Sequence, residues 1–454
     1  MTLLRVILRS CHSLPPRACL AWHRHRHFTS SLTISTTAAA TAGPQGLEIP
    51  SLNATYAYRW LRDACTCPSC IHPSTQQKLH RTSDIPASIT PESVEISDDG
   101  VHISWAGPDR HRSFFSQALL AAHAAPSALH SFHNDVPVAP WPTESALLTA
   151  SGPDLEVPYG ELATPRGLLR AITQLQRTGL LFLRDVPSTD TSDANCEIRK
   201  LAACFAEVRD TFYGDVWNVK TMDESRNIAY TSLFLGLHMD LLYVLHQRLH
   251  FNDNVNLFAI CRYFESPPRF QILHCLRNRV HGGTSLFVDA FAAAETLRVS
   301  HPSDFTRLVT TPVPFQYIND ARHLHYARPT ITLDSAGGIE PRVTAVNYSP
   351  PFQAPLPLNT PHEFYDALAR FAALVEAPTA MYTHQLCESE AVVFDNRRVL
   401  HGRTAFEGRM LESMGDHREA GGEPSRWLKG CYFEVDAMAS RGRVLRDRAA
   451  RGDI

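Results

Sequence analysis

No apolar run in this sequence approaches the roughly 18 residues needed to span a bilayer, so an integral membrane protein is not expected. No excess of either charge is present, since the formal net charge is -3 over 454 residues, and nothing points to nucleic acid or an anionic membrane as the main partner. The 11 cysteines lack the spacing of a secreted disulfide framework. The chain does contain 44% hydrophobic residues, which is typical of a globular protein, and it is long enough for two domains.

Acidic residues are also absent from the first 47 positions, which are instead rich in Ser, Thr, Ala and Arg. The arginines of this stretch are Arg5, Arg9, Arg17, Arg24 and Arg26. A basic, acid-free amino terminus is typical of a mitochondrial transit peptide, although a disordered basic tail has the same composition. We predict that residues 1–45 are a transit peptide or a disordered segment, and that the protein acts in the mitochondrial matrix.

Three of the cysteines, Cys65, Cys67 and Cys70, form a C-x-C-x-x-C cluster. Thiols this close in sequence cannot comfortably form disulfides with one another, but they can hold a tetrahedral metal ion that takes one further ligand. A structural zinc is favoured over unligated thiols and over an iron–sulfur cluster, and it predicts a small zinc-binding domain over residues 46–124. Spacing alone leaves four candidates for the fourth ligand, namely His72, His80, His102 and His111.

Residues 125–150 are rich in Pro, Ser and His, so we predict a linker there and a second domain over residues 151–454. Short apolar runs between turns predict strands in this domain, and apolar residues at helical spacing predict helices. The expected strands cover residues 179–183, 270–275, 285–289, 331–333, 343–348 and 391–395, and the expected helices cover 168–176, 196–212, 290–299 and 361–376. Many short strands predict a mainly β fold with flanking helices, a double-sheet jelly roll.

One short segment carries metal-binding chemistry. Residues 235–240 spell Leu-Gly-Leu-His-Met-Asp, and on an extended segment His238 and Asp240 project to the same face. His401 can reach the same point from a distant strand. Two imidazoles and one carboxylate leave about half of the positions of an octahedral ion free for a co-substrate and oxygen. The pattern indicates a non-heme Fe(II) oxygenase, although an H-x-D pair by itself is a weak signal.

Aromatic residues precede this segment, because Tyr213 and Trp217 are followed by Tyr230 only eight residues before His238. Such residues more often belong to a core than to a binding site. Beside an iron they would also suit a quaternary ammonium group, which has no hydrogen-bond donor and is attracted to ring faces by roughly 0.5–2 kcal/mol each. Residue types leave both interpretations open.

From about residue 47 to its end, the chain resembles the γ-butyrobetaine dioxygenase and trimethyllysine dioxygenase family of carnitine biosynthesis. The resemblance rests on residues 60–63, Trp-Leu-Arg-Asp, and on residues 395–403, Asp-Asn-Arg-Arg-Val-Leu-His-Gly-Arg. It implies an Fe(II)- and 2-oxoglutarate-dependent oxygenase with a double-stranded β-helix catalytic domain and a small zinc-binding amino-terminal domain. It also favours His111, within Arg-His-Arg-Ser, as the fourth zinc ligand.

The resemblance implies further roles around the iron. Arg426 matches the arginine that grips the distal carboxylate of 2-oxoglutarate, which a planar guanidinium fork suits better than an ammonium does. Arg403 and Arg409 are the alternatives, and they would otherwise hold the loop. An aromatic cage for a trimethylammonium group is implied at Tyr213, Trp217, Tyr230 and Tyr432. Asn227 matches a residue near the substrate carboxylate, and Asn347 is a weaker match for that role.

The reaction implied by the resemblance is hydroxylation of γ-butyrobetaine at C3 to give L-carnitine, with succinate and CO2 as co-products. Its cofactors would be Fe(II), the co-substrate 2-oxoglutarate, a structural Zn(II) and ascorbate as reductant. The expected partners are a small trimethylammonium substrate, 2-oxoglutarate and O2, with no nucleic acid or membrane, and a homodimer is one assembly compatible with this interpretation. Trimethyllysine dioxygenase and a non-catalytic homologue are the alternatives.

The sequence departs from the family pattern after Asp240. In the family the H-x-D is followed within a few residues by a Pro-Pro-x-x-Gln strand, whereas here His238 and Gln271 are 33 positions apart. Residues 244–263 therefore look like an aberrant insertion, and their removal restores a continuous family pattern. We hypothesise a short in-frame retained intron, which a mature transcript encoding these residues would refute. A second excess, residues 407–422, is polar and predicts a surface loop.

Overall fold

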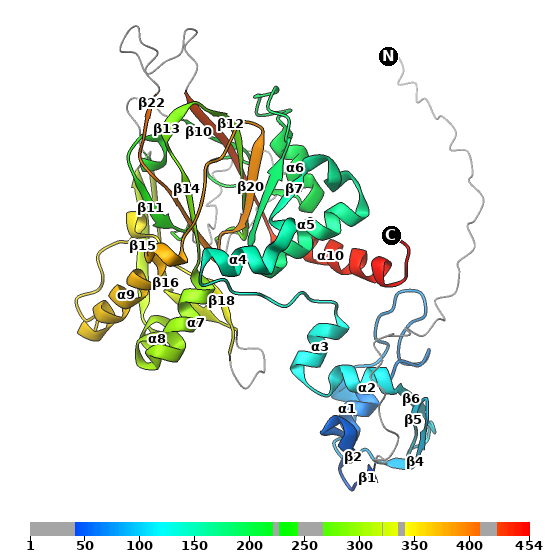
Figure 1. Cartoon of the computed structure of the whole chain (residues 1–454). Helices are drawn as coiled ribbons and strands as arrows, with labels where there is room; N and C mark the ends of the chain where they lie inside the picture. The colour runs from blue at the N-terminus through cyan, green and yellow to red at the C-terminus, as the bar shows by residue number, and fades with distance from the viewer. Residues whose placement is uncertain (1–40, 221–226, 244–266, 320, 335–340, 409–424) are drawn as a thin grey trace, which may run out of the picture. The chain divides into compact units, whose positions relative to one another are not determined.

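The computed structural model describes residues 41–220, 227–243, 267–319, 321–334, 341–408 and 425–454. The chain divides into two compact units, Met1–Ala128 and Leu129–Ile454, whose elements are labelled in Figure 1. The first 40 residues of the expected transit peptide and the whole expected insertion at 244–263 lie outside the described residues. Within the described part of the chain, no helix has both the length and the apolar character that a membrane crossing requires.

Residues 41–124 of the amino-terminal unit form two small antiparallel sheets and the α-helices α1 (Tyr58–Asp63) and α2 (Gln117–His123). The first sheet consists of β1 (Thr41–Ala42), β2 (Gly46–Ile49) and β3 (Ala54–Ala57), and the second of β4 (Pro91–Ser97), β5 (Gly100–Trp105) and β6 (Arg112–Ser116). In β5, Ile103 and Trp105 are buried whereas His102 is exposed. This alternation places one face of the strand against the core, with Leu61 and Phe115.

Two facing sheets form the centre of the carboxy-terminal unit. The seven-stranded sheet contains β10 (Trp217–Lys220), β23 (Arg426–Phe433), β12 (Phe270–Asn278), β20 (Glu390–Asp395), β8 (Leu180–Arg184) and β7 (Glu156–Pro158) in that order, with β9 (Val208–Arg209) beside β23. The four-stranded sheet has the order β11 (Leu235–His238), β21 (Val399–Arg403), β14 (Ser285–Asp289), β19 (Tyr382–His384). Phe287 of β14 packs against Phe182 and Phe394 of the larger sheet, with ring centroids 5.8 Å apart in both pairs.

Helices flank these sheets, and short hairpins extend them (Figure 1). Helices α5 (Pro165–Thr178), α6 (Glu197–Phe205) and α10 (Val435–Ala450) cover the outer face of the seven-stranded sheet. A separate core gathers α7 (Ala290–Ser300), α8 (Pro302–Thr310) and α9 (His362–Val375) with strands of the four-stranded sheet and of the hairpins. The two-stranded ladders are β13 (Val280–Gly282) with β22 (Phe406–Gly408), β15 (Pro312–Asn319) with β16 (Arg322–Pro329), and β17 (Ile331–Leu333) with β18 (Val343–Val346). The unit is thus mainly β with flanking helices, although its larger sheet is mixed, because β7 runs parallel to β8.

Local sequence explains where α5 and β8 begin and end. The Thr164 hydroxyl accepts a hydrogen bond from the Gly167 N–H as the N-cap, and Pro165 occupies the first turn. Gly179 ends the helix with φ 78°, a left-handed conformation that glycine adopts without steric cost. The next four residues of β8 are all buried, since the sheet is covered on both faces.

Three expectations about secondary structure differ from the fold. The surface loop expected over 407–422 begins inside β22, and its residues 409–422 lie outside the described residues. The helix expected over 196–212 ends at Phe205, because the chain then becomes extended at Ala206 and pairs with β23 through β9. The linker expected over 125–150 contains α3 (Pro126–Phe132) and α4 (Glu144–Ser151). Trp141 between them is fully buried, and its two N–H groups donate to Asp289 and to the Thr178 carbonyl. The Pro- and Ser-rich composition of this segment did not predict that Trp141 is buried and hydrogen-bonded.

Candidate metal centres and active site

Strands β11 and β21 bring the first predicted metal-binding group together. They pair antiparallel with His238 opposite His401, and the ring centroids are 4.2 Å apart. Asp240 lies two residues after the end of β11, with Oδ1 3.4 Å from His238 Nε2 and Oδ2 3.8 Å from His401 Nε2. One ligand atom from each of the three residues lies within 4.8 Å of the others. The tertiary fold therefore converges the three side chains on one point, as the spacing of the motifs predicted.

Asn396 is a site residue that the sequence did not single out. Its amide oxygen accepts from the Asp240 N–H at 2.9 Å, and its amide nitrogen donates to the Asp240 carbonyl at 3.2 Å. The residue after Asp240, Leu241, has φ 63°, a costly conformation for a buried branched side chain. Asn396 thus holds the backbone of Asp240 where the chain turns sharply. The sequence places Asn396 in the segment around His401, but it does not indicate the contact of Asn396 with Asp240, which lies 156 positions away.

Aromatic side chains line a cavity against His238 and Asp240. The lining includes all four residues of the predicted cage, Tyr213, Trp217, Tyr230 and Tyr432, together with Asn227 and an additional ring, Phe352. Trp217 lies at the centre of this arrangement, because its ring centroid is 6.5 Å from that of Tyr213 and 5.4 Å from that of Tyr432. Phe352, in a short 3-10 turn (Pro350–Phe352), was not predicted, since nothing local distinguishes it from a core residue.

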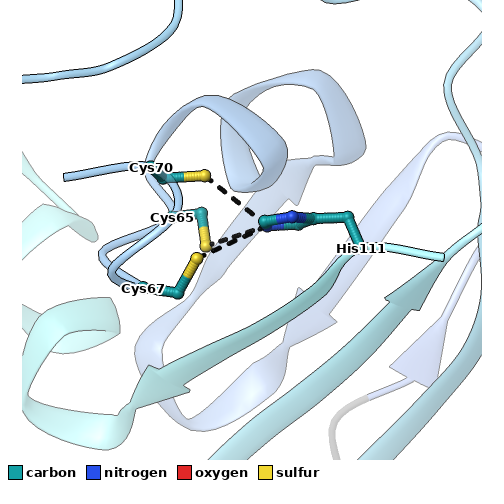
Figure 2. Close-up of side chains that lie close together, drawn as sticks. All are labelled: Cys65, Cys67, Cys70 and His111. Atoms are coloured by element: carbon teal, nitrogen blue, oxygen red, sulfur yellow. Dashed lines mark hydrogen bonds between the residues drawn. The ribbon is translucent and has the colours of Figure 1, made fainter. Parts of the chain in front are cut away.

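The cysteine cluster and His111 meet in the amino-terminal unit. Figure 2 shows the three cysteine side chains gathered around the ring of His111. The distances from His111 Nε2 to the sulfur atoms are 3.3 Å for Cys65, 3.8 Å for Cys67 and 3.5 Å for Cys70. The cysteines follow α1, and His111 immediately precedes β6. The other candidate histidines lie in different contacts: His72 accepts from the Thr75 N–H, His80 lies 3.3 Å from Asp63, and His102 lies 4.0 Å from Asp99.

Comparison with known proteins matches each of the two units to a protein family. Residues 47–121 match the family model of the gamma-butyrobetaine hydroxylase-like amino-terminal domain, and residues 261–432 match the taurine catabolism dioxygenase TauD, TfdA family. Dioxygenase str8 from Strobilurus tenacellus is 47% identical over 90% of this chain and 89% of its own length. Gamma-butyrobetaine dioxygenase from Pseudomonas sp. (strain AK-1) is 30% identical over 85% of this chain and 89% of its own length. The chain belongs to the γ-butyrobetaine hydroxylase-like family of Fe(II)- and 2-oxoglutarate-dependent dioxygenases.

A third relative of this dioxygenase is mitochondrial trimethyllysine dioxygenase from Homo sapiens, 26% identical over 93% of this chain and 90% of its own length. Family membership implies Fe(II) and 2-oxoglutarate, and the residues at β11 and β21 fit an iron. His238 Nδ1 lies 2.9 Å from the Gly236 carbonyl, so an N–H there directs the lone pair of Nε2 toward Asp240 and His401. This is the hydrogen bond that orients a metal-binding imidazole.

Protonation states at this site also suit a cation. Burial alone would raise the pKa of the Asp240 carboxyl, but its hydrogen bond with His238 and the nearby His401 hold that pKa well below the usual value. Burial, with His238 beside it, lowers the pKa of His401 to about 3. At neutral pH the dioxygenase therefore presents an ionised carboxylate and a neutral His401 imidazole, the forms that bind metal ions.

Arg426 has the properties of an anchor for an anionic co-substrate. It is 4% exposed and lies on the inner face of β23, which also carries Leu428, Gly430 and Tyr432. In the described part of the dioxygenase no carboxylate pairs with Arg426, its Nε has no hydrogen-bond partner, and its guanidinium lies 5.3 Å from the Phe406 ring centroid. Burial lowers the pKa of Arg426, because a charge removed from water needs a counter-charge. A bound carboxylate would supply that charge.

The alternative arginine and the two asparagines make structural contacts. Arg403 donates to the carbonyls of Leu233, at 2.7 Å, and of Thr231, so it holds the loop that follows the cage residue Tyr230. Arg409 lies outside the described residues. Asn227 caps a 3-10 turn through Ala229 N–H and donates to the Tyr213 hydroxyl at 3.3 Å. Asn347 donates to the Pro329 carbonyl and to Thr332, and it is not among the residues that line the cavity.

The four donors of the amino-terminal unit fit a zinc ion. Bonds of about 2.3 Å to sulfur and 2.0 Å to nitrogen in a tetrahedron place sulfur and nitrogen about 3.5 Å apart, which matches the distances from His111. Arg62 donates to the Cys70 sulfur at 3.2 Å, so one positive charge already lies beside the thiols. Burial raises the pKa of the Cys70 thiol to about 12. Its thiolate form therefore depends on the additional charge of a bound ion.

Proposed function

We propose that this dioxygenase hydroxylates γ-butyrobetaine at C3, consuming O2 and 2-oxoglutarate and releasing L-carnitine, succinate and CO2. The observation that carries the proposal is the shared cavity, which is lined by four aromatic cage residues and by the side chains of His238 and Asp240. A trimethylammonium group has no N–H to donate, so ring faces are the groups that attract it, by roughly 0.5–2 kcal/mol each. Anchored there, the substrate would extend its chain toward the iron.

In this proposal the protein supplies position rather than acid or base catalysis. His238, Asp240 and His401 would hold the iron, and Arg426 would bind the distal carboxylate of 2-oxoglutarate. Iron with its co-substrate supplies the oxidation that replaces a C–H bond by C–OH. The wall formed by Trp217 and Tyr432 fixes the ammonium end, and the distance from that end to the iron selects the carbon that is oxidised.

Trimethyllysine is the second candidate substrate, because it carries the same trimethylammonium group. The relative with 47% identity bears only the name dioxygenase, and the γ-butyrobetaine enzyme of Pseudomonas is 30% identical, so overall similarity does not decide between substrates. A non-catalytic homologue is the third candidate, since the expected insertion at 244–263 follows Asp240 closely.

The discriminating assay incubates purified protein with Fe(II), 2-oxoglutarate and ascorbate and measures succinate with each substrate. The proposal predicts succinate above the substrate-free rate with γ-butyrobetaine, together with L-carnitine detected by mass. An Asp240→Asn variant is the negative control, because it removes the carboxylate from the iron site. Succinate only with trimethyllysine would transfer the assignment to that substrate, and none with either would favour the non-catalytic homologue.

We further propose that the protein acts in the mitochondrial matrix, on the strength of its acid-free, arginine-containing amino terminus. A carboxy-terminally tagged protein should co-fractionate with matrix markers, and deletion of residues 1–40 should leave it in the cytosol. A full-length protein that stays cytosolic would refute the targeting. The homodimer belongs to the same proposal, and light scattering at the mass of one chain would contradict it.

A further inference from the structure

Tyr432 contacts the iron-binding site directly through its hydroxyl group. The Tyr432 hydroxyl donates to Asp240 Oδ2 at 2.8 Å, from the inner face of β23. The other oxygen, Oδ1, lies 3.4 Å from His238 Nε2, and Oδ2 itself lies 3.8 Å from His401 Nε2. Tyr432 is only 2% exposed, so water does not compete freely for this hydrogen bond. We infer that Tyr432 is a positioning residue for the iron ligand Asp240, in addition to forming a wall of the aromatic cavity.

A single carboxylate ligand needs such a restraint. When one carboxylate oxygen binds a metal ion, the other is free to rotate or to bind the ion as well, which would occupy a position needed by a co-substrate. A donor on the second oxygen prevents both movements. Hydrogen bonds of this kind to metal ligands contribute about 10–100-fold to metal affinity.

The backbone and the side chain of Asp240 are thus held from two different elements. Asn396 bonds the backbone N–H and carbonyl from the loop before β21, and Tyr432 bonds the carboxylate from β23 in the other sheet. Strand β23 carries Gly430 under the Trp217 ring as well, so the same strand that shapes the ammonium site also orients an iron ligand. Substrate that stacks on the Tyr432 ring would contact the residue that holds Asp240.

Tyr432→Phe tests the inference because it keeps the ring and removes only the hydroxyl. Fe(II) affinity is measured anaerobically by competition with a chromogenic chelator, in the absence of substrate and 2-oxoglutarate. We expect Fe(II) to bind the variant about 10–100-fold more weakly than the wild type. Tyr230→Phe is the matched control, since its ring lines the same cavity and no hydrogen bond joins it to an iron ligand in the described structure. Its Fe(II) affinity should stay within twofold of the wild type.

Circular dichroism and zinc content establish that both variants are folded before they are compared. Equal Fe(II) affinity of Tyr432→Phe and the wild type would overturn the inference, and so would an equal loss in both variants, which would indicate a general effect of altering the cavity. The inference rests on the iron site of the family and not on the proposed substrate. Failure of the substrate assay would leave the Fe(II) result unaffected, so the two failures are distinguishable.

Discussion

Alanine at Gly430 should displace the indole of Trp217 and weaken binding of the ammonium substrate. Gly430 is paired with Trp217 across β10 and β23. A Cβ atom on Gly430 would lie 2.2 Å from Trp217 Cη2, 2.3 Å from Cζ2 and 2.4 Å from Cζ3. Carbon atoms pack at about 3.5–4.0 Å, so the ring must move by more than 1 Å. Such a shift changes the position of the ring relative to that of Tyr432, whose centroid is 5.4 Å away.

The expected size of the effect follows from the loss of one ring. A cation loses roughly 0.5–2 kcal/mol per ring face, which corresponds to an increase in KM of about 2- to 30-fold. Crowding of the packed site should also lower the free energy of unfolding by about 1–3 kcal/mol. The KM for 2-oxoglutarate should stay unchanged, because Arg426 lies four positions away on β23 and keeps its backbone pairing.

The assay measures succinate formation at varied concentration of whichever substrate the wild type accepts. Gly160→Ala is the matched control, because a Cβ atom there would meet nothing within 4 Å. Its kinetics and its unfolding should equal those of the wild type. A KM for the ammonium substrate within twofold of the wild-type value in Gly430→Ala would refute the reasoning that the Trp217 wall sets substrate affinity.

Three further predictions concern the co-substrate, the pH and the zinc. Arg426→Lys should raise the KM for 2-oxoglutarate by at least about 10-fold, because an ammonium cannot donate to both carboxylate oxygens in parallel; an unchanged KM would exclude Arg426 as the anchor. Burial lowers the pKa of His274 to about 4, so as the pH is lowered the unfolded state binds the proton before the folded state does. The free energy of unfolding should therefore fall by up to about 1.4 kcal/mol per pH unit as the pH is lowered from 6.5 to 4. Urea unfolding of the wild type and of His274→Leu should show a smaller pH slope in the variant, and equal slopes would contradict this origin. Cys67→Ser should lose zinc and destabilise the amino-terminal unit, whereas Cys204→Ser, outside the cluster, should retain zinc by metal analysis.

The sequence by itself determined the chemistry wherever that chemistry is local. His238 and Asp240 share a face because alternate residues of an extended chain do so, and the cysteine cluster has metal-binding spacing in any fold. Strands such as β8 and β12 were also predictable, since uninterrupted apolar runs between turn residues have few other conformations in a soluble core. These patterns were sufficient to predict the class of metal centre and a mainly β catalytic unit.

Only the tertiary structure decided which distant groups complete each site. Spacing left four histidines open as the fourth zinc ligand, and the family resemblance favoured His111. The fold brings His111 to the thiols, although it lies 46 positions from Cys65. Asn396 holds the backbone of Asp240 across 156 positions, and Tyr432 holds its carboxylate across 192. No local pattern signals such contacts, because they depend on how strands from two sheets pair and pack. For the same reason residue types alone left the aromatic residues open between a core and a binding site. The family resemblance implied the four-residue cage, and the fold adds Phe352 to the residues that line the cavity.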